Sequence, residues 1–130
     1  MINITLAKNT GFCFGVRRTI ELVDKTLDDD NNNVYSLGPV IHNEFVLDRL
    51  AKNGLKIIDK SDLSSICNST IVICSHGIEK YIYDIIAKNN NKIVDLICPF
   101  VKKIHKLVEK YADLGKYILV IGDPKHAEFK

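Results

Sequence analysis

Apolar positions along the chain switch repeatedly between two spacings, and each switch predicts a new element. Four helices are indicated by apolar residues at helical spacing, the first near residues 16–27. Gly54 and Gly115 follow two of these stripes and predict helix ends. Short apolar or alternating runs predict six strands: residues 2–7, 34–37, 56–58, 71–74, 93–97 and 117–121.

The alternation of strand and helix patterns predicts an α/β fold with a mostly parallel sheet. Crossover connections between parallel strands are right-handed, so the loops from strand to helix lie at one edge of the sheet. That edge, at the carboxyl ends of the strands, is where ligands bind in such folds. The loops that follow the strands are therefore the expected location of a functional site.

A cysteine or histidine follows five of the six predicted strands. These residues are Cys13, His42, His76, Cys98 and His126. A single histidine in a loop is usually only solvated. Because all five would meet at one edge of the sheet, we expect them to form a shared site.

The two site cysteines stand where a helix is expected to begin. Cys13 lies in the sequence GFCFG, and Cys98 is followed by proline, which fits the first position of a helix. A helix N-terminus favours the thiolate, the form that binds metals. From the residues alone, Cys98 also fits a small apolar side chain at a strand end. Cys74 is expected in the core and Cys67 in a polar loop.

The histidines suit an anionic ligand because imidazole N–H groups and helix N-termini both donate to phosphate oxygens. Asn43 is expected to cap a helix beside His42. Glu128 fits a proton donor if the site excludes water, and taken alone it fits an ordinary surface glutamate. His105 falls within a predicted helix and is expected to pack as a structural residue. No phosphate-binding loop of a nucleotide fold and no paired C-x-x-C motif is present.

Composition restricts the class of protein. The 130 residues are 46% hydrophobic and 26% charged, with a net charge of +2, which favours neither nucleic acid nor membrane binding. No apolar run reaches the ~20 residues of a membrane span, and no secretory leader pattern begins the chain. We therefore expect a cytoplasmic protein whose cysteines are thiols or metal ligands.

Five short motifs, in this order, resemble those of the 4-hydroxy-3-methylbut-2-enyl diphosphate reductases. They are Gly11–Val16 (GFCFGV), Gly38–Asn43 (GPVIHN), Ser75–Gly77 (SHG), Asp95–Pro99 (DLICP) and Gly122–Glu128 (GDPKHAE). The order and rough spacing agree along the whole chain. Departures from the usual motif residues at Ser75, Leu96, Ile97 and Ala127 remove none of the reactive groups.

The resemblance implies a cofactor and a role for each site residue. Enzymes of this family carry a 4Fe-4S cluster on three cysteines, which leaves one iron open for the substrate hydroxyl. By position, Cys13 and Cys98 would be cluster ligands and Glu128 would supply a proton. The three loop histidines, His42, His76 and His126, would bind the diphosphate. The products would be isopentenyl and dimethylallyl diphosphates, with electrons from a ferredoxin or flavodoxin.

The resemblance also implies three α/β lobes around the cluster. Residues 1–97 would be the first lobe and residues 98–130 the start of the second. The family's third cysteine would lie beyond residue 130, so we expect a fragment that is inactive alone. Two other interpretations stay open: a non-catalytic phosphate-binding α/β domain, and a thiol-based redox or interaction module.

Overall fold

A computed structural model describes residues 2–8, 10–29, 33–74 and 77–122. The helices are α1 (Phe14–Asp29), α2 (Glu44–Lys52), α3 (Lys80–Lys88) and α4 (Pro99–Asp113), with one 3-10 turn, η1 (Asp62–Ser65). The strands are β1 (Val34–Leu37), β2 (Lys56–Ile58), β3 (Thr70–Ile73) and β4 (Lys92–Asp95). Among these residues no helix is long and apolar enough to cross a membrane.

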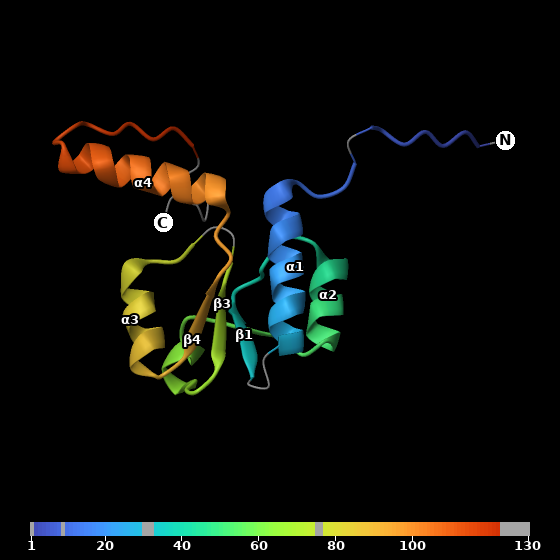
Figure 1. The fold of residues 1–130 in the computed structure, drawn as a ribbon, viewed down its shortest axis with the longest axis horizontal. Helices are drawn as coiled ribbons and strands as arrows, with labels where there is room; N and C mark the ends of the chain where they lie inside the picture. Colours follow the sequence, from blue (N-terminus) through green and yellow to red (C-terminus); the bar gives the residue numbers. More distant parts are fainter. Residues whose placement is uncertain (1, 9, 30–32, 75–76, 123–130) are drawn as a thin grey trace.

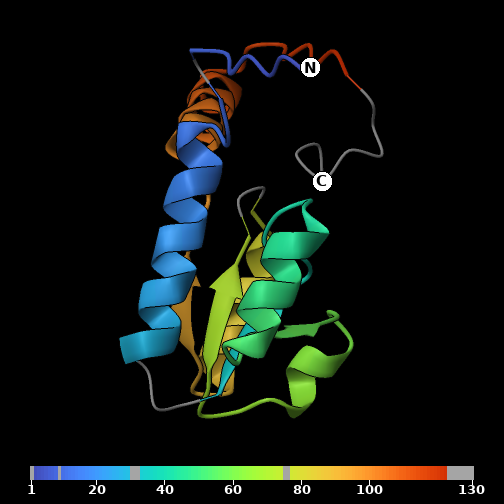
Figure 2. The same cartoon turned by 90° about the vertical axis from the view of Figure 1, so that its right-hand side faces the viewer.

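The four strands form one parallel sheet in the order β2-β1-β3-β4. Helices α1 and α2 cover one face of this sheet, and α3 and η1 cover the other (Figure 1). The predicted α/β fold with a parallel sheet is therefore confirmed. The 90° view shows α1 and α2 lying side by side along the strands (Figure 2).

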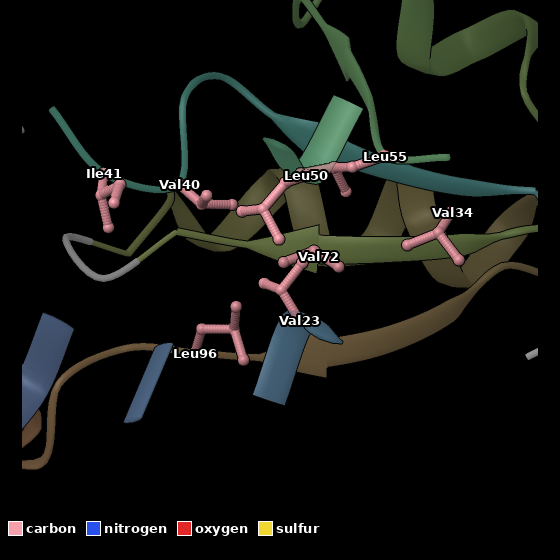
Figure 3. Packing of buried hydrophobic residues seen from close by; sticks show 8 residues of the cluster. All are labelled: Val23, Val34, Val40, Ile41, Leu50, Leu55, Val72 and Leu96. Atoms are coloured by element: carbon pink, nitrogen blue, oxygen red, sulfur yellow. The ribbon is translucent and has the colours of Figure 1, made fainter. Parts of the chain in front are cut away.

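Apolar side chains fill the space on both faces of the sheet. Between the sheet and α1 and α2, the fully buried residues include Val23, Leu50 and Val72 (Figure 3). A second cluster, under α3 and η1, contains Leu63, Ile71, Ile82 and Ile86. Burial of strand residues on both faces explains why residues 70–73 form a continuous buried run rather than an alternating one.

Local signals place the helix ends as predicted. The side chain of Asn43 accepts a hydrogen bond from the Val46 N–H at 3.1 Å and caps α2. Gly54 has a φ of +109°, a conformation that residues with a β-carbon rarely adopt, and it follows the end of α2. Helix α4 begins at Pro99, directly after Cys98, as the Cys-Pro pair predicts.

Two predicted strands are absent. Residues 2–7 and 117–121 contain no strand, and most of their apolar side chains are exposed, as for Ile4 and Leu119. A strand needs a neighbour to take its backbone hydrogen bonds, and neither segment has one in the described part of the chain. The alternation of residues 2–7 and the continuous apolar run of residues 117–121 therefore do not by themselves produce strands.

Helix α4 lies beyond the sheet and carries no buried residue. In Figure 1 it crosses above α3 at the carboxyl ends of the strands. His105 is accordingly exposed, so its expected structural packing is wrong. The reason is that α4 has little to pack against in the described part of the chain. Phe100, Ile104 and Tyr111 are exposed for the same reason.

Candidate functional site

Cys13 and Cys98 both occupy the residue just before a helix. The carbonyl of Cys13 accepts the Arg17 N–H at 3.0 Å, which is the first hydrogen bond of α1. The carbonyl of Cys98 accepts the Lys102 N–H at 3.0 Å at the start of α4. Each sulfur therefore lies near the positive end of a helix dipole, where a thiolate is favoured.

The two sulfurs converge on Gly15, in the first turn of α1. A β-carbon at Gly15 would lie 2.9 Å from Cys98 Sγ and 3.9 Å from Cys13 Sγ. The sulfurs are therefore no further apart than the sum of these two distances. Gly15 is buried, and the Cys98 sulfur occupies the space that a side chain at this position would need. The predicted pairing of these cysteines at one site agrees with this geometry, although no strand precedes Cys13.

Thiolates at this spacing fit an iron–sulfur or other metal group that takes cysteine ligands. Cys13 is exposed and Cys98 is half-buried, so both are accessible to such a group. No set of three or more potential metal-ligating side chains gathers in the described residues. Cys13 and Cys98 are therefore candidate members of a ligand set and do not complete one within the described residues.

His42 lies in the loop between β1 and α2, at the carboxyl edge of the sheet. It is exposed, and Asn43 beside it caps α2. The same loop begins at Gly38, whose N–H donates to the Ile58 carbonyl at 3.0 Å. His42 and Cys98 thus both belong to loops at one edge of a parallel sheet, as the sequence predicted.

His76, His126 and Glu128 lie outside the described residues. Their roles remain predictions from the sequence. Cys67 is exposed in a loop, as expected.

Cys74 differs from expectation because it is only half-buried. It lines a hollow of about 240 Å³ at the carboxyl ends of β1, β2 and β3, together with Leu37, Asp59 and Gly77. The sequence placed Cys74 in the core because it continues the apolar run of β3. That run ends one residue earlier, at Ile73, where the sheet stops and the loop begins. None of the described site residues lines this hollow.

Asp95 is a second residue whose place only the structure reveals. Its Oδ1 accepts the Ile97 N–H at 2.9 Å, and its Oδ2 pairs with Lys102 Nζ at 2.6 Å. It therefore contacts both the loop before Cys98 and the first turns of α4. The only sequence signal was its place in the Asp95–Pro99 motif.

The phenol of Tyr83, on α3, is perturbed near this loop. Partial burial raises its pKa above the ordinary value, and the negative charges of Asp95 and Cys74 raise it further. Tyr83 also lines a groove of about 840 Å³ between α3 and α4, with Ile97 and His105. The Asp95 carboxylate therefore interacts electrostatically with Tyr83 on α3 as well as with Lys102 on α4.

A family model described as LytB protein matches residues 4–130. The chain belongs to the LytB family. Curated relatives from Alkaliphilus oremlandii (strain OhILAs) and Clostridioides difficile (strain 630), both named 4-hydroxy-3-methylbut-2-enyl diphosphate reductase, are 41% and 42% identical over 128 residues. Each alignment covers 98% of this chain and 45% of the relative.

Solved structures of LytB-type proteins share the fold. One, of (E)-4-hydroxy-3-methyl-but-2-enyl diphosphate reductase, the terminal enzyme of the non-mevalonate pathway, matches with a TM-score of 0.84 at 32% identity, over 99% of this chain and 45% of that one. The reductase from Plasmodium falciparum also matches with a TM-score of 0.84, over 94% of this chain and 38% of its own. The chain thus spans less than half the length of its relatives.

Proposed function

We propose that this chain is the first portion of a LytB-family reductase that acts on 4-hydroxy-3-methylbut-2-enyl diphosphate. In the proposed reaction the allylic C–O bond breaks, and one proton converts the leaving hydroxyl to water. Two electrons and a second proton form a C–H bond on the allylic carbons, and the products are isopentenyl and dimethylallyl diphosphates. The names of the relatives support this choice of substrate.

The observation that carries the proposal is the convergence of Cys13 Sγ and Cys98 Sγ around Gly15. Two thiols at two helix N-termini are a suitable partial ligand set for a 4Fe-4S cluster. A packed structural role for these cysteines would need neither the exposure of Cys13 nor the two helix starts. When bound, such a cluster would supply the electrons and an open iron for the substrate hydroxyl.

The remaining site residues have the roles that the family resemblance implies. His42, His76 and His126 donate hydrogen bonds to the diphosphate, and Glu128 delivers a proton to the reacting group. The third cysteine ligand comes from sequence beyond this chain. The electron donor is a ferredoxin or a flavodoxin, and the enzyme works in the cytoplasm.

The proposed division into lobes comes from the family resemblance, and the 45% coverage of the relatives leaves room for further lobes. Residues 1–97 belong to the first lobe and residues 98–130 begin the second. Helix α4 has no buried residue in the described part of the chain, which is consistent with this boundary, because a second lobe would supply a surface that covers it. The chain alone lacks a complete ligand set and is expected to be inactive.

The decisive experiment is anaerobic iron–sulfur reconstitution of the longer protein that continues past residue 130. Iron, sulfide and visible absorbance are measured in the wild type, in Cys98→Ser and in Cys67→Ser. Cys67 is the matched control because it is an exposed loop cysteine away from the proposed ligand set. We expect a full cluster in the wild type and in Cys67→Ser, and its loss in Cys98→Ser.

Two results would contradict the proposal. One is a folded longer protein that takes up no cluster. The other is a Cys98→Ser variant that holds a normal cluster. If the affinity for diphosphate is unchanged when both Cys13 and Cys98 are replaced, the result would instead favour a non-catalytic phosphate-binding domain. A reactive thiol at Cys13 with no ligand preference would favour a redox module.

A further inference from the structure

Helix α4 is only partly packed in the described part of the chain. It has no buried residue, and Phe100 in its first turn makes an edge contact with Phe14 of α1, with the ring centroids 6.5 Å apart. The strand before it is well fixed, because the Leu96 N–H donates to the Ile73 carbonyl at 3.1 Å and Leu96 is fully buried. Cys98 lies between this fixed segment and the loosely packed helix.

One carboxylate spans that junction. Asp95 Oδ1 accepts the Ile97 N–H at 2.9 Å, just before Cys98. Asp95 Oδ2 pairs with Lys102 Nζ at 2.6 Å, one turn after Cys98. The Lys102 N–H in turn donates to the Cys98 carbonyl at 3.0 Å. Ile97, before Cys98, and Lys102, after it, thus both contact the Asp95 carboxylate.

We propose that Asp95 is a positioning residue that directs the Cys98 sulfur toward the space left by Gly15. The ion pair with Lys102 fixes the first turn of α4, and the bond to Ile97 fixes the loop from β4. Cys98 is then held where its sulfur approaches Cys13. The proposal rests on the proposed function in one respect only, since it is the cluster that makes the position of Cys98 important.

The exposure of the pair distinguishes positioning from stabilisation. The side chains of Asp95 and Lys102 are 33% and 42% exposed, and ion pairs this open add little to global stability. They are also weakened by salt. Loss of the pair should therefore loosen Cys98 locally and leave the folded sheet intact.

The test is alkylation of the cluster-free longer protein by iodoacetamide, with the rate at each cysteine read by peptide mass spectrometry. Asp95→Ala removes both contacts, Asp95→Asn keeps an acceptor for Ile97, and Lys102→Gln removes only the ion pair. Lys102→Arg is the conservative control, and circular dichroism checks folding. If Asp95→Ala fails to fold, Asp95→Asn and Lys102→Gln carry the test.

We expect the Cys98 rate to rise at least about threefold in Asp95→Ala and less in Lys102→Gln, with Cys13 unchanged. Lys102→Arg should behave as wild type. Added salt should raise the Cys98 rate in the wild type but not in Lys102→Gln. Unchanged Cys98 rates, or equal rises at Cys13 and Cys98, would overturn the proposal.

Reconstitution of the same variants separates this proposal from the proposed function. Weakened iron binding in Asp95→Ala, beside a full cluster in the wild type, supports both. If the wild type takes up no cluster, the proposed function fails, and the alkylation rates still decide the role of Asp95. If the wild type is loaded and the variants match it in alkylation, only the positioning role fails.

Discussion

Replacement of Gly15 by alanine tests whether the space in the first turn of α1 belongs to the Cys98 sulfur. A β-carbon at Gly15 would lie 2.9 Å from Cys98 Sγ, whereas ordinary contacts between such atoms are about 3.5–4.0 Å. The sulfur would therefore have to move by about 0.5–1 Å. Cys13 Sγ, at 3.9 Å, would not be pushed directly.

Two opposing terms set the change in stability. Alanine in place of glycine within a helix is favourable by about 1 kcal/mol, and Gly15 lies within α1. Overpacking against a fixed neighbour costs about 1–3 kcal/mol. The free energy of unfolding should therefore fall by no more than about 2 kcal/mol. The effect on the ligand set should be larger, because a cluster requires its thiolates at fixed positions.

The assays are urea unfolding, followed by iron and sulfide content after reconstitution of the longer protein. Glu21→Ala is the control, since it changes helix propensity at an exposed position of the same helix without contacting either sulfur. We expect Gly15→Ala to remain folded and to bind substantially less iron than Glu21→Ala. A Gly15→Ala protein with wild-type iron content and an unchanged Cys98 alkylation rate would refute the steric argument.

Three further predictions concern the sheet and its helices. Leu50→Ala, at a fully buried site, should lower the free energy of unfolding by about 2–5 kcal/mol in urea titrations, and a loss under 1 kcal/mol would contradict the packing described. Asn43→Ala removes the acceptor for the Val46 N–H and should cost about 0.5–2 kcal/mol, with Asn43→Asp as the retained-cap control. Tyr83 should be among the last tyrosines to ionise in an ultraviolet titration, and Tyr83→Phe should remove that component. Folding raises the pKa of Tyr83 above its ordinary value of about 10. The contribution of Tyr83 to the free energy of unfolding is therefore fully present below a pH of about 10 and is lost as the pH rises through the pKa of the folded state.

Much of the scaffold could be predicted because its signals are local. The helical stripes of α1 to α4, the cap at Asn43 and the Cys-Pro start of α4 depend on residues a few positions apart. The buried run of β3 predicted a strand covered on both faces, which the structure confirms. The strand predictions from the alternation of residues 2–7 and from the apolar run of residues 117–121 were wrong, because a strand also needs a partner and a local pattern cannot report one.

The sequence by itself determined the α/β class, the placing of His42 and Cys98 after strands, and the pairing of Cys13 with Cys98 as candidate ligands. These features could be predicted because the spacing of apolar residues, the residues that start helices and the order of the motifs are all local properties of the sequence. Only the tertiary structure showed that Gly15 leaves room for the Cys98 sulfur and that Asp95 connects the loop before Cys98 to α4. It also showed His105 exposed and Cys74 beside a hollow. These features depend on which elements meet in space, and contacts between distant segments leave no period in the sequence.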